Sequence, residues 1–236
     1  MTLDSMTKPE FDVIPHYEPC PSPEKIQPVA QIRRMGVSTN NCMIIGGEAR
    51  FLGSTTITLT DEYPRFPIPV DYVDGRFTLT DMCDETQITV LENQPVRTTG
   101  SYVITMKHLS SFRNCPRDIG VHCILQETKI AEFDHAPDTI GMNLVLTDTS
   151  FRSLSGIHET AIKDTVIRGK VVIHEDTTNI LGLALMPGVM RVGWSVISQT
   201  TSGSQSKSVI IDVSHRDVIR FQDELLELGL VNQARL

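Results

Sequence analysis

Side chains that alternate between apolar and polar along most of the chain are the feature that most limits what this sequence can fold into. Ile57 and Leu59 alternate with threonines, and similar alternation recurs at 77–80 and 102–106. A period of two places every second side chain on the same face of a β-strand, whereas a helix needs a period near 3.6. Threonine beside aliphatic residues suits a half-buried pleated surface. The alternation therefore predicts strands for the body of the protein.

The predicted strands extend from residue 29 to 213, and we find no internal repeat of fixed period. Beyond those already named, strands are expected at 119–127, 140–148, 165–175, 189–198 and 207–213. Turn-forming residues separate them, and Asp74-Gly75 is a typical hairpin pair. Because no long helical pattern falls between strands, a doubly wound α/β fold is excluded. We predict an all-β body, a mostly antiparallel sandwich or barrel.

Three segments follow from this pattern. Residues 1–28 contain six prolines, which remove backbone donors and favour extended geometry, so they are expected to form an extended Pro-rich arm. This arm is either a disordered tail or a segment that orders against a neighbouring subunit, through residues such as Pro15 and Tyr17. Residues 29–213 form the β-rich body, where turn formers at 134–139 mark a weak boundary between two β subdomains.

The third segment, residues 214–230, is predicted to be an amphipathic α-helix. Ser214 is its expected cap, with Asp217 at the third helical position, and Gly229 ends it. Phe221 and Leu225 fall on one apolar face together with Val218 and Leu228. That face either packs on the β-body or binds a partner subunit.

Composition limits the class of protein. The chain has 21 basic and 29 acidic side chains, giving a net charge of -8. This excludes a surface that is basic throughout. Five cysteines without a CxxC pair argue against a zinc ribbon and a complete disulfide framework. No secretory leader pattern and no apolar stretch of about 20 residues is present, so we expect no transmembrane segment and a cytoplasmic location.

The candidate catalytic patterns each fail a geometric or spacing test. His122 and Cys123 are neighbours on a predicted strand, so their side chains point to opposite faces. A zincin motif that starts at His158 would need histidine at 162, where the chain has Ile162. The acidic turn at 81–85 is interpreted as a solvated hairpin tip. No catalytic residue, metal ligand or cofactor is therefore assigned.

One basic stripe is the candidate contact for an anion. On the predicted strand 165–175, Arg168, Lys170 and His174 share a face that opposes the apolar Ile167, Val171 and Ile173. Phosphate, RNA or anionic lipid headgroups are suitable partners for such a stripe, and the alternative is an ordinary solvent face. The pair Arg33-Arg34 extends the stripe if folding brings it close.

Three functions remain open at this point. The favoured one is a non-enzymatic assembly protein that forms homo-oligomers through its arm and its helix. Viral or phage coat, matrix, movement and tail proteins share this build, and such a protein would reside in the host cytoplasm or the virion. The second is a small-molecule enzyme or binding protein with a cavity in a β-barrel or sandwich, using His122, His174 or the acidic turn. The third is an RNA- or anion-binding module that uses Arg168 and Lys170.

Overall fold

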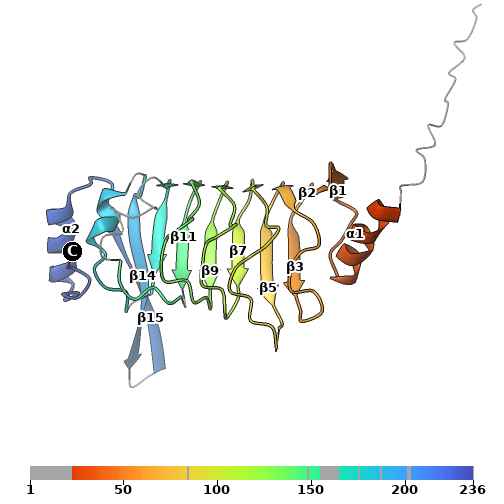
Figure 1. The fold of residues 1–236 in the computed structure, drawn as a ribbon. Helices are drawn as coiled ribbons and strands as arrows, with labels where there is room; N and C mark the ends of the chain where they lie inside the picture. Colours follow the sequence, from red (N-terminus) through yellow and green to blue (C-terminus); the bar gives the residue numbers. More distant parts are fainter. Residues whose placement is uncertain are drawn as a thin grey trace, which may run out of the picture.

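The body of the protein is a β-solenoid, in which the backbone winds through successive coils stacked along one axis. The structure, a computed structural model, describes residues 23–83, 85–147, 149–154, 165–174, 176–186, 188–200 and 203–235. Helix α1 (Pro23–Arg34) lies at one end of the stack and helix α2 (Val218–Glu227) at the other (Figure 1). The predicted β-rich body is confirmed, but the predicted antiparallel sandwich or barrel is wrong.

Two sheets follow the length of the solenoid within the described residues. Sheet A has seven strands: β1 (Cys42–Ile45), β2 (Glu48–Phe51), β4 (Val70–Val73), β6 (Arg97–Thr98), β8 (Asp118–Ile119), β10 (Thr139–Ile140) and β12 (Val166–Ile167). Sheet B has eight: β3 (Thr55–Leu59), β5 (Phe77–Asp81), β7 (Tyr102–Thr105), β9 (Cys123–Gln126), β11 (Leu144–Thr147), β13 (Lys170–Ile173), β14 (Arg191–Thr200) and β15 (Gly203–Asp212). From β2 to β13 the chain alternates between the sheets, so each coil contributes one strand to each.

Strand pairing is parallel except at the ends of the sheets. Strand β1 pairs antiparallel with β2, and β14 pairs antiparallel with β15. Within the body the pairs are parallel, and Leu144 of β11 lies opposite Cys123 of β9 and Val171 of β13. Parallel neighbours cannot be joined by a tight hairpin and need a crossover connection. Here the crossover is the rest of the coil, which passes through the other sheet.

Three of the long strands predicted from alternation, 119–127, 140–148 and 165–175, are each two short strands in different sheets, whereas 189–198 and 207–213 correspond to the single strands β14 and β15. The predicted strand 119–127 divides into β8 and β9 around Gly120, and 165–175 divides into β12 and β13 around Gly169. Asp74-Gly75 likewise connects β4 of sheet A to β5 of sheet B and is no hairpin turn. The alternation of apolar and polar residues continues across the corner between the two sheets, so it does not show where one strand ends and the next begins.

Glycine occupies this corner because consecutive coils approach closely there. A Cβ atom on Gly120 would collide with the carbonyl oxygen of Thr99, and one on Gly141 would collide with the carbonyl oxygen of Gly120. The corner also carries a ladder of backbone bonds, in which the Gly141 amide donates to the Ile119 carbonyl at 2.8 Å. Gly120 and Gly141 are 21 residues apart, whereas register partners in sheet B are separated by 21 to 27 residues, so the coils are a structural repeat without a fixed period.

One continuous apolar core fills the solenoid. Register partners in sheet B stack their buried side chains into an inner column: Phe77, Tyr102, Cys123, Leu144, Val171 and Val192. The rings of Phe77 and Tyr102 stack with centroids 5.7 Å apart. Because β8 pairs with β10 and β9 with β11, both sheets run through residues 134–139 without interruption. The two predicted β subdomains are therefore one body.

The N-terminal end of the core is covered by α1 and the turn after it. Ile32 and Val37 are buried there, at 0% and 4% exposure. Residues 1–22 of the predicted arm lie outside the described residues, whereas residues 23–28 are helical and not extended as predicted. Proline is compatible with the start of a helix, because the first amides have no intrahelical acceptor. Pro28 lies further in and removes one helical hydrogen bond.

The C-terminal end is closed by the 3-10 helix η3 (Leu181–Leu185) and by α2, which packs on η3 and β15. Phe221 and Leu225 point into the core, at 2% and 0% exposure. The helix begins at Val218, and the cap is Asp217, whose carboxylate accepts from the Arg220 amide at 3.0 Å. The predicted cap, Ser214, instead bonds to Asp212 in the preceding turn.

Candidate functional site

A polar groove runs along the outer face of sheet A. It consists of two adjoining depressions of about 380 and 350 Å³, which share Arg97 and Asp118. Arg168 lies at one end of the groove and Arg50 at the other. The remaining lining residues are Asp71, Tyr72, Val96, Thr98, Thr99, Ile119, Gly120, Thr139 and Gly141. The groove therefore combines charged side chains, one aromatic ring and the glycine corner.

Arginine–aspartate pairs cross the groove face as rungs between coils. Arg50 pairs with Asp71 at 2.6 Å, and Arg97 pairs with Asp118 at 3.4 Å. A third rung, Arg117 with Asp138 at 3.6 Å, continues the series beside the groove. In each rung the aspartate follows its arginine by 21 residues, which is the length of one coil in this region. The rungs are thus a direct product of parallel stacking.

The charges along the groove are not equally satisfied. Asp118 accepts from the Thr139 hydroxyl at 2.8 Å in addition to its contact with Arg97. The Arg97 side chain keeps 62% of its surface exposed, and its contact with Asp118 is long. Arg168 is exposed, and its side chain has no partner among the described residues. The hydrogen-bond donors still available in this half of the groove are therefore guanidinium N–H groups, which suit an anionic ligand.

The structure separates the predicted basic stripe. Gly169 lies at a corner, so Arg168 lines the groove of sheet A, whereas Lys170 begins strand β13 in sheet B. Lys170 and Val172 share the outward side of β13, opposite the buried Val171 and Ile173. His174 follows that strand and lies 3.5 Å from the Asp176 carboxylate.

The second predicted basic element lies far from that stripe. Arg33 and Arg34 end helix α1, near the opposite end of the molecule from β13 (Figure 1). Arg33 donates from Nε to the Thr39 hydroxyl at 3.1 Å. Folding therefore does not bring this pair close to Arg168.

The candidate nucleophile is part of the core. Cys123 is fully buried, and burial raises the pKa of its thiol well above the ordinary value. Burial also raises the pKa of Cys115 to about 12, and the Tyr102 hydroxyl donates to its sulfur at 3.7 Å. His122 accepts from the Asn143 amide through Nδ1 at 3.3 Å. Both thiols are protonated at neutral pH, so neither is an activated nucleophile.

The acidic turn is organised by a structural contact. The Asp61 carboxylate accepts from the Thr86 amide at 2.7 Å and from the Glu85 amide at 3.2 Å. Desolvation raises the pKa of Asp81, against the lowering effect of His108 and Lys107. Asp84 and the pair His158-Glu159 lie outside the described residues. Within the part of the chain that the structure describes, no cluster of His, Cys, Asp and Glu can hold a metal ion.

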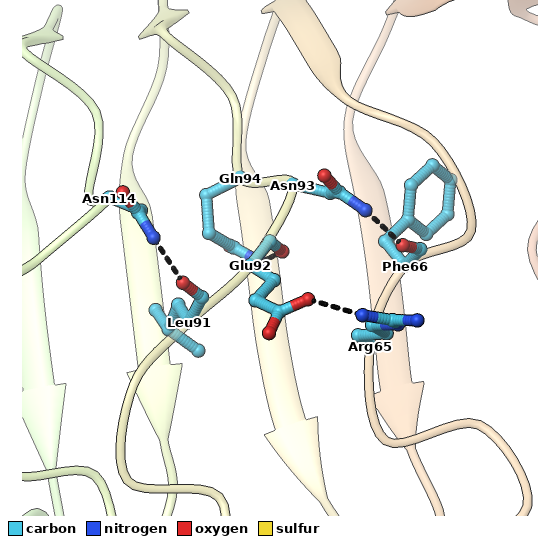
Figure 2. A network of polar contacts seen from close by, with 7 residues as sticks. All are labelled: Arg65, Phe66, Leu91, Glu92, Asn93, Gln94 and Asn114. Carbon is cyan, nitrogen blue, oxygen red and sulfur yellow. Dashed lines mark hydrogen bonds and ion pairs between the residues drawn. The ribbon is translucent and has the colours of Figure 1, made fainter.

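A second polar network lies on the loop side of the coils (Figure 2). Asn93 and Asn114 occupy equivalent positions with φ of 56° and 66°, in the left-handed region that asparagine tolerates. Each donates its side-chain amide to the preceding coil, at 2.7 Å to the carbonyls of Phe66 and Leu91 respectively. These amides are satisfied by the backbone, so we assign the network to coil stacking.

Of the predicted oligomer contacts, Phe221 and Leu225 face the chain's own core, and Pro15 and Tyr17 lie outside the described residues. The groove residues missed by sequence analysis were Arg50, Asp71, Tyr72, Arg97, Asp118 and Thr139. Their signal is the 21-residue spacing of Arg/Asp pairs, which becomes visible only when the repeat is recognised.

Comparisons of the chain with known protein families, curated proteins and solved structures find no match. The helices that the structure describes include none long and apolar enough to cross a bilayer.

Proposed function

We propose that the protein is a non-enzymatic assembly protein, a rigid solenoid that self-associates through elements added to its ends. The observation that carries this proposal is the hairpin β14–β15. Its two strands pair along ten residues each, whereas β13 pairs with β14 only at Arg191, Val192 and Gly193. The outer part of the hairpin projects beyond the body (Figure 1).

The projecting part has no registered partner in the body. Among the described residues, β14 beyond the buried Trp194 pairs only with β15, as far as Thr200. A two-stranded ribbon alone is marginally stable in water, and it leaves one backbone edge unpaired on each side. Contact with a neighbouring subunit would stabilise both the ribbon and its edges. This is the build expected of an element that connects subunits.

The kind of assembly is part of the proposal. A viral or phage coat, matrix, movement or tail protein, located in the host cytoplasm or the virion, fits a rigid body with added arms. Electron microscopy of the assembled protein would distinguish a closed shell from a tube, a ring or a sheet. A small, single-copy particle would contradict every member of this group.

The experiment compares the full chain with a variant in which residues 197–206 are replaced by Asn-Gly, a two-residue hairpin turn. We expect light scattering after size exclusion to give an oligomer for the full chain and a smaller species for the variant. The melting temperature of the variant should be almost unchanged, because the body keeps its core. A full chain that is strictly monomeric would overturn the proposal, and an unchanged oligomer size would remove the hairpin from it.

A second candidate function is anion binding in the groove of sheet A, supported by the Arg168 guanidinium, which has no partner among the described residues and lines the same depression as Arg97. Single-stranded RNA, a phosphate or an anionic headgroup would meet both cations there. We expect Arg97→Ala/Arg168→Ala to reduce a salt-sensitive affinity for a short RNA, with Lys170→Ala as the matched control on sheet B. Equal effects of the two changes would contradict a groove-specific site. The enzyme alternative has less support, because neither His122, His174 nor Asp81 lines the groove.

A further inference from the structure

Helix α2 carries a second apolar stripe on the side away from the core. Ile219 is 72% exposed and Leu226 is 46% exposed, while Phe221 and Leu225 on the inner side are buried. Ile219 and Leu226 are seven residues apart, about two helical turns, so they lie one above the other along the outer side. The helix therefore closes its own solenoid with one face and presents another to the outside.

Charged residues border this stripe in an ordered way. Arg220 lies in the first half of the helix, and Asp223 and Glu227 lie in the second half; all three are exposed. Arg220 pairs within the helix with Glu224 at 3.1 Å. Asp223 and Glu227 have no ion-pair partner among the described residues. The outer side is thus basic toward its N-terminus and acidic toward its C-terminus.

This polarity selects one occupant. We infer that α2 binds α2 of a second copy of this chain, antiparallel and about a two-fold axis, which rests on the self-association proposed above. In that arrangement Ile219 packs against Leu226 of the second copy, and the same contact is made twice. A parallel pairing would instead place like charges side by side.

The antiparallel register also brings the charges to matching levels. With Ile219 opposite Leu226 of the second copy, Arg220 lies between that copy's Asp223 and Glu227, about 3 Å along the axis from each. The two-fold axis repeats this contact, so each guanidinium group faces two carboxylates, and the two Asp223 side chains lie about 1.5 Å apart along the axis between the two guanidinium groups. The stripe is short, so we expect a weak contact that gains strength from the other interfaces of the assembly.

The decisive experiment exchanges charges between two variants of the full chain. Arg220→Glu makes the border wholly acidic, and Asp223→Lys/Glu227→Lys makes it wholly basic. Each variant alone should raise the dimer dissociation constant by about tenfold or more, because like charges then meet across the two-fold axis. An equimolar mixture should form a heterodimer, seen by native mass spectrometry, since every facing pair is then opposite in sign.

Matched controls change the same charges elsewhere on the exposed surface, with Arg76→Glu for the first variant and Glu132→Lys/Asp134→Lys for the second. Mixing these controls should give no heterodimer. Ile219→Ser should also weaken the dimer, whereas Ile45→Ser, at a side chain 50% exposed on the other end of the molecule, should not. Thermal melts verify that each variant is folded.

The outcomes separate this inference from the proposed function. An assembly that forms normally, with no preference for the charge-swapped mixture, would overturn the α2 contact and leave the assembly proposal intact. A full chain that is monomeric, together with a mixture that gives no heterodimer, would overturn both. A heterodimer in the swapped mixture that dissociates at high salt would support both.

Discussion

The inner and outer columns of the same coils differ in what they require of their residues. Inside, the column from Phe77 to Val192 is buried at every coil, and its members vary in size because neighbours compensate. Outside, the Arg–Asp rungs remain more than 30% exposed on both partners. The inner columns hold the coils together, whereas the outer columns leave their chemistry free for contacts. Substitutions along each column should therefore have very different costs.

The largest effect is expected at the glycine corner, where the inner and outer columns meet. Gly141→Val should prevent the native fold, because its side chain would collide with the backbone of the preceding coil. Circular dichroism and size exclusion would show the loss. The control is Gly46→Ala, at φ +62° with no atom within 4 Å of a Cβ, where we expect a cost of about 1 kcal/mol. A folded Gly141→Val variant would contradict the close approach.

The next largest difference is expected in the reactivity of the cysteine thiols. With its pKa raised to about 12, Cys115 has a thiolate fraction at pH 8 about 1000-fold below that of an ordinary thiol. Cys115, which is partly exposed but has its pKa raised to about 12, and the buried Cys123 should resist alkylation in the folded protein, whereas the partly exposed Cys42 reacts slowly. Peptide mass spectrometry after alkylation, with and without denaturant, measures the difference.

The same shift has a consequence for stability. The folded Cys115 keeps its proton up to about pH 12, while the unfolded thiol releases it near its ordinary value of 9.0. Raising the pH between these values therefore favours the unfolded state. If the free energy of unfolding changes equally between pH 9 and 12 in the native chain and in Cys115→Ser, the assignment is contradicted.

Core truncation comes third. Ile104 is fully buried on β7, so Ile104→Ala should lower the free energy of unfolding by about 2–5 kcal/mol. Its outward neighbour Thr105→Ala should cost less than about 1 kcal/mol. Urea titrations monitored by fluorescence of the single tryptophan, Trp194, provide both values. Similar costs at the two positions would contradict the inward and outward assignment.

A smaller effect is expected in the asparagine ladder. Asn114→Ala removes the hydrogen bond to the Leu91 carbonyl. It also places alanine, which tolerates the left-handed region less well than asparagine, at φ 66°, so we expect a loss of about 2 kcal/mol. Asn114→Gly keeps the backbone conformation and should lose about 1 kcal/mol, the share of the hydrogen bond. Denaturant midpoints distinguish the two, and equal losses would show that the backbone conformation contributes little.

The outer rungs should matter least for stability. Arg97→Ala removes a pair whose partners are 62% and 42% exposed, so a loss of about 0–1 kcal/mol is expected. A double-mutant cycle with Asp118→Ala isolates the coupling from the separate bond between Asp118 and Thr139. A coupling well above 1 kcal/mol would give the rungs a structural role that their exposure does not suggest.

Sequence analysis predicted the class of secondary structure and missed its connectivity. Alternation at Ile57 and Leu59 predicted strands, and both residues are inward-facing and buried. Pairing direction depends on which strand lies beside which, and alternation carries no information about that. Pro95, Pro116 and Pro137 recur every 21 residues and would have indicated stacked coils, because a solenoid repeats at the length of one coil.

Of the residues that line the groove, Arg168 alone was among the anion contacts predicted from the sequence. Arg97 and Asp118 are 21 residues apart along the chain, and they become partners only when coils stack in parallel register. The stripe of Arg168, Lys170 and His174 assumed one uninterrupted strand, and Gly169 breaks it. The inner side of the C-terminal helix was predictable, because a period near 3.6 identifies Phe221 and Leu225 without knowledge of the fold.

The one-coil translation has a consequence for how such a chain can change in length. Duplicating or deleting about 21 residues between equivalent corners, such as Gly120 and Gly141, would leave every remaining rung, glycine contact and core column with a neighbour of the same kind. Only the separation of the two helical caps would change, by about 4.8 Å per coil. The number of coils therefore sets the length of the molecule, while the helices α1 and α2 that close its ends stay the same.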